Sequence, residues 1–323
     1  MIESAGVEPD ARVLADASGD REAFHAVVGP HLRAIHLHCY RMLGSYHDAE
    51  EASQEVLLRA WRSLPGFEGR APLRHWLYRI ATTTCLKVLA RRARQATSVA
   101  DLTELEPYPD RLLDELAPGQ DPAAEVQRRE SVALAFVVAL QLLPATQRAV
   151  LILRDVLTFS ATEVAEVLGS SVAAVNSALQ RARATLRTGD ACQPPRPLEA
   201  VEQHLVSQFM DAWHRCDIPA LSALLREDVI LRMPPEPVEF HGRIAVADFF
   251  ATVPADGHLD RLPLRVTAAN GQPALAAYDT VSDGPAAAYG LMVLTITDGA
   301  IAAITGFRDP ALFHAFGLPA TLG

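Results

Sequence analysis

Residues 160–187 have the sequence SATEVAEVLGSSVAAVNSALQRARATLR. The first part predicts a short helix, because Ser160 can cap its N-terminus while Glu163, three positions later, completes a capping box. Gly169 then allows the turn that ends this helix. In the second part, apolar residues recur at spacings of three and four and form one stripe of a second helix: Val172, Val175, Leu179, Ala182 and Leu186. The stretch therefore predicts a helix-turn-helix.

The face of the second helix opposite this stripe is suited to binding DNA. Its N-terminal half carries short side chains that let the backbone approach a major groove, and its C-terminal half carries arginines that can contact phosphates. A helical hairpin with a basic end remains the alternative on these residues alone. The residues predicted to contact DNA on this helix are Ser170, Ser171, Ala174, Ser177, Arg181, Arg183 and Arg187.

Charge is distributed unevenly along the 323-residue chain, whose net charge is −10. Residues 56–100 contain nine basic residues and one acid, whereas residues 101–130 contain nine acids and three arginines. Residues 171–189 contain three arginines and no acid, and residues 191–323 contain fifteen acids and eight basic residues. Two basic islands in an acidic chain indicate DNA contact at two places, with two solvated faces as the alternative on charge alone.

Composition divides the chain into helical and mixed parts. Residues 20–95 and 126–188 have helical periodicity, and the acidic, proline-containing stretch between them predicts a flexible linker. Prolines in GDACQPPRPLEA, residues 189–200, indicate a second linker. Beyond it, two helical patterns precede five runs with strand-like alternation and glycine turns, which predict an α+β domain with a curved antiparallel sheet.

The helical part upstream contains an acidic helix followed by a basic one. Residues 44–92 read GSYHDAEEASQEVLLRAWRSLPGFEGRAPLRHWLYRIATTTCLKVLARR. The spacing predicts that Ala49, Val56 and Ala60 point inward on the first helix while its acids project outward. In the basic segment, cations can hold phosphates and aromatic rings can support unstacked bases. Trp76 is interpreted as a core residue, whereas Tyr78 fits either role.

These two stretches resemble regions of the extracytoplasmic-function (ECF) sigma factors. Residues 44–92 resemble region 2 through the pattern D-A-E, Q-E, A-W, F-x-G-R and W-L-Y-R-I-A, and LP with QRAVLILRDV before the helix-turn-helix resembles region 4. The resemblance implies an alternative sigma factor that binds RNA polymerase core and directs promoter recognition and transcription initiation. In that family, region 2 binds the β′ clamp helices and the −10 element, and region 4 binds the β flap and the −35 element.

The resemblance also implies roles for individual residues of region 2. The polymerase-binding residues would be Asp48, Glu51, Gln54 and Glu55. Those contacting the −10 element would be Arg70, Arg74, Tyr78, Arg79, Thr83, Lys87 and Arg91. The chain departs from the family at Ala81-Thr82-Thr83, where ATN is frequent, and at Lys87, where an acid is frequent, so the promoter sequence is left open.

The C-terminal part resembles SnoaL-like domains of the NTF2-like superfamily through AWHRCDIPAL, LREDVILRMPP and HGRIAVADFF. The resemblance implies a cone, formed by a curved sheet around helices, with an apolar pocket that could take a small-molecule ligand. The expected pocket residues are Trp213, Arg232, His241, Phe249, Tyr278 and Tyr289. The domain is expected to modulate sigma activity in cis. The alternative is a cone-fold isomerase or cyclase fused to a DNA-binding module, but no spacing identifies catalytic residues, so no enzyme is predicted.

The predicted architecture is multi-domain, with two all-α sigma domains and a C-terminal α+β cone. The boundaries are sigma region 2 at 1–95, an acidic flexible linker at 96–125, sigma region 4 at 126–190, a linker at 191–197 and the SnoaL-like regulatory domain at 198–323. Neither the histidines nor the four cysteines have metal-ligand spacing, so no metal and no cofactor are expected. Without an apolar run long enough for a membrane, or a signal-peptide pattern, a cytoplasmic protein is expected.

Overall fold

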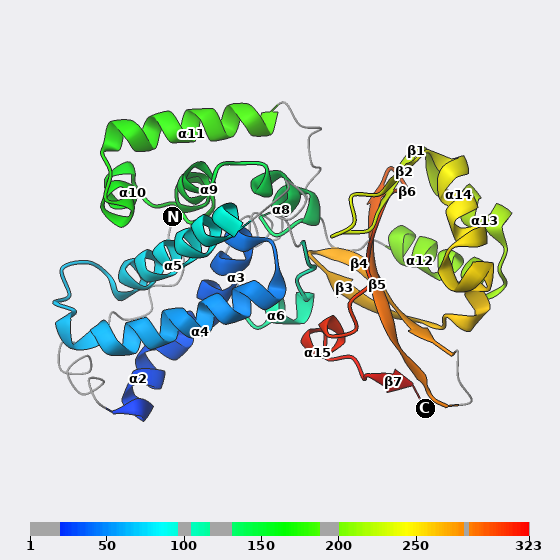
Figure 1. The fold of residues 1–323 in the computed structure, drawn as a ribbon, viewed down its shortest axis with the longest axis horizontal. Coiled ribbons are helices and arrows are strands. Elements are labelled where there is room, and N and C mark those ends of the chain that lie inside the picture. The colour runs from blue at the N-terminus through cyan, green and yellow to red at the C-terminus, as the bar shows by residue number, and fades with distance from the viewer. Residues whose placement is uncertain (1–19, 96–104, 117–130, 188–199, 281–283, 323) are drawn as a thin grey trace. The chain divides into compact units, whose positions relative to one another are not determined.

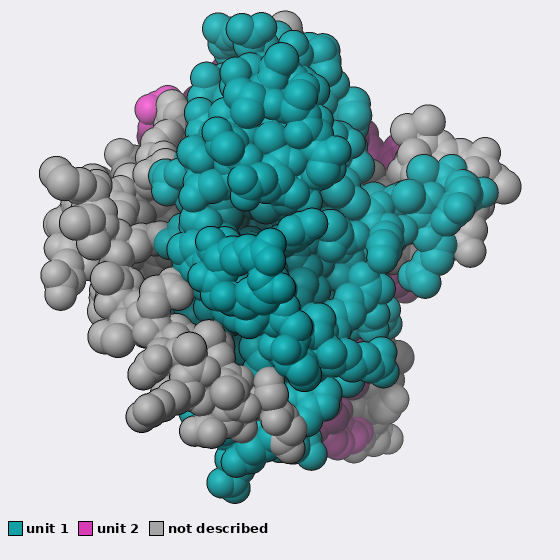
Figure 2. Space-filling model, turned by 90° about the vertical axis from the view of Figure 1, so that its left-hand side faces the viewer, with its two compact units in different colours: residues 1–105, 114–194 teal, residues 106–113, 195–323 magenta. Residues whose placement is uncertain are grey.

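The computed structural model describes residues 20–95, 105–116, 131–187, 200–280 and 284–322 (Figure 1). These residues form two compact units, coloured teal and magenta in Figure 2. The first unit contains residues 1–105 and 114–194, and the second contains residues 106–113 and 195–323. The chain therefore enters the second unit briefly, returns to the first, and then completes the second.

The N-terminal half of the first unit is a helical bundle. Asp20 and Ser45 cap two of its helices by accepting hydrogen bonds from Glu22 and Asp48 backbone amides, at 2.9 and 3.2 Å. Its core lies where α3, α4 and α5 pack together (Figure 1). The helices are α2 (Arg21–Val28), α3 (Leu32–Leu43), α4 (Tyr46–Ser63) and α5 (Leu73–Gln95), with short 3-10 turns at Gly29–His31 and Leu64–Gly66.

The other half of the first unit contains the predicted helix-turn-helix. The helices are α8 (Leu134–Gln141), α9 (Ala145–Leu151), a π-helical turn (Ile152–Val156), α10 (Ala161–Leu168) and α11 (Val172–Arg187). Both bonds of the capping box form, since Ser160 N–H donates to Glu163 Oε2 at 2.6 Å and Glu163 N–H donates to Ser160 Oγ at 3.2 Å. Gly169 ends α10 with φ of 60°. The helix-turn-helix prediction is confirmed.

The buried face of α11 differs slightly from the predicted stripe. Val175, Leu179 and Ala182 are buried, as expected. Val172 is exposed and Leu186 is half-buried, because they lie in the first and last turns of the helix, where fewer neighbours surround a side chain. Ala178 completes the buried face instead.

Two buried arginines join the two halves of the first unit. Arg148 on α9 donates through Nη1 to the Met42 carbonyl of α3 at 2.5 Å, and Arg41 on α3 donates through Nη2 to Ser131 Oγ at 2.5 Å. Burial lowers the pKa of Arg148 to about 10, which leaves the guanidinium charged near neutrality. In the free protein these hydrogen bonds link α3 to α9 and to Ser131, which precedes α8.

The second unit is the α+β domain. Its elements are α12 (Ala200–His214), α13 (Ile218–Ala223), β1 (Leu225–Arg232), β2 (Glu239–His241), α14 (Arg243–Thr252), β3 (Leu264–Ala269), β4 (Gln272–Asp279), β5 (Ala286–Thr297), β6 (Ala300–Phe307), α15 (Leu312–Ala315) and β7 (Thr321–Leu322). The strand order is β2-β1-β6-β5-β4-β3, and β7 pairs with β5. Helices α12, α13 and α14 lie on one face of the sheet (Figure 1).

The sheet departs from the antiparallel prediction at one pair. Strands β1 and β6 run parallel, whereas the other pairs are antiparallel. These two strands are far apart in sequence and are joined by the intervening elements, so no hairpin dictates their direction. The hairpins occur where Asn270-Gly271 and Asp298-Gly299 adopt positive φ, at the β3–β4 and β5–β6 turns.

Part of the stretch predicted to be a flexible linker has defined structure in the second unit. Tyr108 is fully buried, and its backbone forms two hydrogen bonds with Asn270: its N–H donates to the side-chain Oδ1 of Asn270 at 2.8 Å and its carbonyl accepts from the Asn270 backbone N–H at 2.9 Å. Asp110 begins α6 (Asp110–Asp114) and accepts from Gly271 N, and Arg111 Nε donates to the Ala315 carbonyl at 2.7 Å. The acidic composition of this stretch did not predict these contacts. The rest of the two predicted linkers, within residues 96–104, 117–130 and 188–199, lies outside the described residues.

Candidate nucleic-acid interfaces and ligand pocket

Helix α4 places its apolar and acidic residues on different faces. Ala49, Val56 and Ala60 are buried, as the spacing predicts. On the acidic side, Glu51 and Gln54 are exposed. The other two candidate residues already have cationic partners: Asp48 is paired with Arg92, and Glu55 Oε1 accepts from Arg59 Nε at 2.5 Å. The helix therefore brings the four candidates together, with Glu51 and Gln54 the most open to a partner.

The candidate −35 residues are all exposed; Ser170 and Ser171 precede α11, and the other candidates lie on its outer side. They differ in how far their polar groups are already engaged. Arg183 forms two hydrogen bonds with Asp155, at 2.8 and 2.6 Å, and this contact raises the pKa of Arg183. Ser171 Oγ accepts from Ala174 N at 3.2 Å and so begins the helix. Among the described residues, Arg181 has no ion-pair partner. Sequence spacing could not indicate the 28-residue separation of the Arg183–Asp155 pair.

The candidate −10 residues do not share one environment: Arg70 precedes α5 and the others lie along it. Arg70, Arg79, Lys87 and Arg91 are exposed, and Arg70 is paired with Glu68. Thr83 is half-buried, with its hydroxyl bonded to the Arg79 carbonyl at 2.8 Å. Arg74 and Tyr78 are covered by the turn that precedes α10, because Arg74 Nη2 donates to the Leu157 carbonyl at 3.3 Å and Tyr78 is 5% exposed.

The interpretation of Trp76 as a core residue is wrong. Its side chain is half-buried and packs against Phe67, with ring centres 4.9 Å apart. Both rings line a surface hollow together with Arg70 and Arg79, and Glu68, Glu163 and Glu166 also line it, so the hollow combines aromatic rings with side chains of both charges. Tyr78 takes the buried position instead, because its ring meets Phe159 of the helix-turn-helix half.

The second unit contains an apolar cavity of about 140 Å³ between the sheet and helices α12 and α14. Three of the expected pocket residues line it, namely Trp213, Phe249 and Tyr289. Trp213 is buried, and its Nε1 donates to the Leu262 carbonyl at 3.0 Å. The indole polar group is therefore already satisfied within the wall.

The structure places the other three expected pocket residues elsewhere. Leu231 and Ala277 line the cavity, and Arg232 and Tyr278 are the next residues on the same strands. Because successive side chains of a strand point to opposite faces of the sheet, Arg232 and Tyr278 point away from the cavity. Arg232 Nε donates to Glu239 Oε1 at 2.7 Å, and Tyr278 OH donates to the Pro319 carbonyl at 3.1 Å. His241 lies on the edge strand β2, largely exposed, with its Nε2 2.9 Å from Glu239 Oε2.

Sequence reasoning missed Arg308, which lines the cavity directly after β6. Its guanidinium lies over the Tyr289 ring, 5.4 Å from the ring centre. None of the residues that line the cavity is an aspartate, a glutamate or a histidine. The wall therefore offers a cation and a phenol hydroxyl but no ordinary general base.

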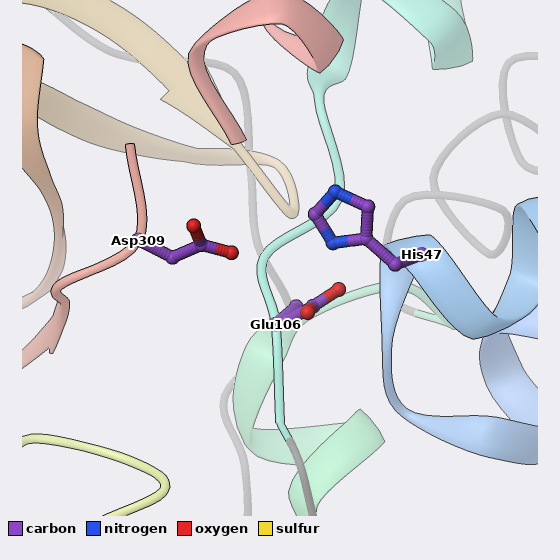
Figure 3. A group of neighbouring side chains, drawn as sticks. All are labelled: His47, Glu106 and Asp309. Carbon is purple, nitrogen blue, oxygen red and sulfur yellow. The ribbon is translucent and has the colours of Figure 1, made fainter. Parts of the chain in front are cut away.

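Figure 3 draws two carboxylates of the second unit, Glu106 and Asp309, whose oxygens lie within 4.8 Å of each other, together with His47 of the first unit. We assign no metal site to a group drawn from both units. Within either unit, the described residues contain no group of three such ligands. The absence of a metal stays a prediction. No helix in the described part of the chain has the length and apolar character needed to cross a membrane.

A helical bundle with an acidic outer helix and a basic helix, a helix-turn-helix and a cone define a sigma-70-type transcription initiation factor with an added domain. Family models match in the same order: Sigma-70 region 2 at residues 27–95, Sigma-70 region 4 at residues 133–186 and a SnoaL-like domain at residues 206–304.

Comparison with characterised relatives is more specific. The chain is 41% identical to the ECF RNA polymerase sigma factor SigG of Mycobacterium tuberculosis, over 97% of this chain and 90% of that protein. This chain belongs to the ECF RNA polymerase sigma factors.

Two further relatives separate the sigma half from the added domain. The ECF RNA polymerase sigma factor SigW of Bacillus subtilis is 28% identical over 54% of this chain and 93% of its own length. The crystal structure of the extracytoplasmic function sigma factor SigJ of Mycobacterium tuberculosis superposes with a TM-score of 0.63 and 25% identity, covering 93% of this chain and 100% of that one. SigW thus matches about half of this chain over nearly its own whole length, whereas the SigJ structure matches nearly the whole of this chain.

Proposed function

We propose that this chain binds the RNA polymerase core, reads two promoter elements, and has this activity modulated in cis by its C-terminal domain. Membership of the ECF sigma factors supports the first two parts. The observation that carries the third is the position of residues 106–113, which lie between the two sigma regions in sequence and belong to the C-terminal unit in space. The protein would act in the cytoplasm, with no membrane partner.

Polymerase docking is assigned to the acidic side of α4, which would contact the β′ clamp helices. Glu51 and Gln54 are the strongest candidates because both are exposed. Asp48 and Glu55 contribute less, since each already faces an arginine of its own unit. Region 4 would contact the β flap, as the family resemblance implies.

Promoter recognition is divided between α11 and α5. The outer face of α11 would enter the major groove of the −35 element, with Ala174 and Ser177 near base edges and Arg181 on a phosphate. On α5, Arg79, Lys87 and Arg91 are exposed and would hold the backbone of the −10 strand. The hollow containing Phe67 and Trp76 offers rings on which an unstacked base could lie.

Modulation in cis would act through the chain segment that joins the two regions. Regions 2 and 4 bind DNA elements that lie apart, so the free length of this segment limits the poses they can reach together. The C-terminal domain holds eight of its residues, 106–113, through buried Tyr108 and four hydrogen bonds to Asn270, Gly271 and Ala315. A change in the C-terminal domain would therefore reach both promoter contacts.

The test is run on the full-length chain with purified core polymerase. Tyr108→Ala should alter promoter affinity and transcript yield, because it removes the buried ring that anchors the segment. Arg265→Ala, an exposed position on the neighbouring strand β3, is the matched control and should match wild type. Equal output from Tyr108→Ala, Arg265→Ala and wild type would contradict modulation through the segment.

The alternative function is a cone-fold isomerase or cyclase joined to a DNA-binding module. Such enzymes need a base beside the substrate, and the cavity wall contains no carboxylate or imidazole. Transcription initiated by the purified chain and core polymerase distinguishes the two, since an enzyme tethered to DNA would not start transcription.

A further inference from the structure

The cavity of the second unit has one polar end in an otherwise apolar wall. Leu231, Phe250, Met292 and Ile304 are among its apolar lining residues. The polar side chains with groups left for a ligand are Tyr289 and Arg308, because the Trp213 Nε1 proton is already donated to Leu262. An apolar molecule entering this cavity would meet a cation at one place only.

The charge of Arg308 is uncompensated within its unit. Arg226 and Arg232 are paired with Asp228 and Glu239, at 2.8 and 2.7 Å. Among the described residues of the second unit, Arg308 contacts the face of the Tyr289 ring and has no carboxylate partner. A guanidinium held over a ring keeps its edge donors free, and these donors match a carboxylate in geometry and charge.

We propose that this cavity binds a small apolar molecule carrying one carboxylate, with the carboxylate on Arg308 and the apolar body among Trp213, Phe249 and the sheet. The inference rests on the proposed regulatory function of this domain and names its ligand class. Cavities of comparable volume, roughly 150 Å³, accommodate a single benzene ring. Arg308 is the one cationic residue in the lining, and a single cation favours a monoanion over a phosphate ester or a dicarboxylate.

Binding can be measured by calorimetry on the full-length chain without polymerase. Benzoate and hexanoate, which distinguish a ring from a chain as the apolar body, should bind, and benzamide should bind roughly tenfold more weakly because it lacks the charge. Arg308→Gln should remove the preference for benzoate over benzamide, whereas Arg265→Gln, the exposed control, should keep it. Because polymerase is absent, a failure here is separate from a failure of the transcription tests.

A filling variant tests the location of the site. A Cβ atom added at Gly306 would meet only Met233 Cγ, at 3.7 Å, and the Arg232 carbonyl, at 3.9 Å, and Gly306 itself lines the cavity. Gly306→Val should therefore occupy the space and reduce the binding of every probe, with its fold checked by circular dichroism. Equal affinity of wild type for benzoate and benzamide, no saturable binding of either carboxylate, or an unchanged preference in Arg308→Gln would overturn the proposal.

A second inference concerns the first unit, where the turn Leu157–Phe159 covers part of α5. Phe159 is 2% exposed, and its ring centre lies 4.3 Å from that of His75 and 5.7 Å from that of Tyr78. The Arg74 guanidinium lies 5.7 Å from the same ring centre. Thr158, just before it, has φ of 60°, a conformation that a β-branched residue seldom adopts without support from its surroundings.

The turn Leu157–Phe159 contacts two of the residues proposed to bind the −10 element, Arg74 and Tyr78. Tyr78 is too buried to meet a base in this state, and the half-buried Arg74 has one guanidinium donor committed to the Leu157 carbonyl. We infer that the turn Leu157–Phe159 holds the free protein in a closed state that opens when the −10 strand binds. His75 Nδ1 lies 3.2 Å from Glu163 Oε1 and adds a second contact between the same two elements. This inference also rests on the proposed −10 residues.

The test measures binding of a single-stranded −10 oligonucleotide to the full-length chain by fluorescence anisotropy. Phe159→Ala should bind roughly fivefold more tightly than wild type, because the competing ring contacts are gone. Glu163→Gln removes the ion pair with His75 while glutamine can still complete the capping box, so it should act in the same direction without loss of the helix. Glu166→Gln removes a carboxylate from the same surface hollow but leaves the ion pair intact, so it measures the effect of charge alone, and Glu163→Gln should exceed it.

If Phe159→Ala is unfolded by circular dichroism, Glu163→Gln alone decides the question. Wild-type affinity in the folded variants would overturn the closed state. Weaker binding in both would show instead that the turn supports the DNA site.

Discussion

Arg181 and Arg183 are two positions apart on α11 and both are exposed, but only Arg183 has an ion-pair partner among the described residues. Arg183 is held by Asp155 of the π-helical turn Ile152–Val156, so an ion pair already compensates its charge before DNA binds. Arg181 carries its full charge on the face that would meet the promoter. Residue type and exposure are the same in the two cases, and the difference lies in one carboxylate.

Arg181→Ala should reduce affinity for −35 duplex DNA and lower the slope of log affinity against log salt by about one unit, because one phosphate contact is lost. Arg183→Ala should change that slope less and should instead lose a surface ion pair, which costs no more than about 1 kcal/mol. Salt titrations of both variants with one duplex provide the measurement. A larger slope change for Arg183 than for Arg181 would reverse the assignment.

Buried histidines make the first unit sensitive to acid. Burial, with a contribution from nearby Arg41, lowers the pKa of His38 to about 3, and burial outweighs Glu50 to lower the pKa of His36 to about 4. In the unfolded chain both would titrate near their ordinary value of 6.5. The free energy of unfolding should therefore be highest above about pH 6.5 and should fall by about 1.4 kcal/mol per pH unit per histidine between pH 6 and 4.

Urea unfolding at several pH values, followed by tryptophan fluorescence, measures this slope. In a Trp213→Phe background, the remaining Trp61 and Trp76 report only on the first unit. His38→Gln should reduce the slope by about half, since Gln can keep a hydrogen bond to Thr82 without titrating. A slope that is the same with and without His38 would show that its proton uptake does not limit stability.

At the scale of elements, helical periodicity predicted the faces of α4 and α11 well, because burial along a helix is a local property. The capping box and Gly169 likewise gave the start of α10 and its end. The exceptions depended on residues distant in sequence. Tyr78 is buried by Phe159, which is distant in sequence. Tyr278 does not line the cavity, because one step along β4 turns a side chain to the opposite face of the sheet. A pattern within one segment cannot indicate which other segment will cover it.

The acidic face of α4 supports a prediction about polymerase. Glu51→Lys should weaken core binding on the order of tenfold, chiefly by slowing association, because it reverses charge at an exposed docking surface. Glu55→Lys should also disturb the pair with Arg59, so the single change at Glu51 is the cleaner test. Glu22→Lys, equally exposed on α2, is the control. Unchanged core affinity in Glu51→Lys would remove this helix from the interface.

At the scale of the molecule, the C-terminal unit is built from two separate pieces of chain. Tyr108 and Leu112 are buried in residues 106–113, far in sequence from the rest of the unit. Truncation after Thr188 therefore does more than remove a domain, because it also exposes these apolar side chains within the linker. The acidic composition of the linker gave no sign of this, since composition does not show which side chains a distant segment will bury.

Limited trypsin digestion can detect that exposure. Arg111 donates to the Ala315 carbonyl in the full-length chain, so cleavage after Arg111 should be slow there and at least tenfold faster after truncation, when local opening is no longer needed. Cleavage after exposed Arg70 should be alike in both and serves as the internal control. Transcription from a cognate promoter should change with the truncation as well. Equal cleavage rates at Arg111 in the two proteins would show that the segment is not held in solution.

The same two-piece construction has a consequence for the order in which the protein is made. A ribosome synthesises residues 106–113 about 200 residues before Ala315, the partner of Arg111. At the usual pace of synthesis this separation corresponds to roughly 10–40 s. Region 2 is already complete when this interval begins and region 4 is completed during it, before Asn270 is made to bind Tyr108. Each newly made copy therefore passes through a period in which its promoter-binding regions exist and the restraint on the segment between them does not.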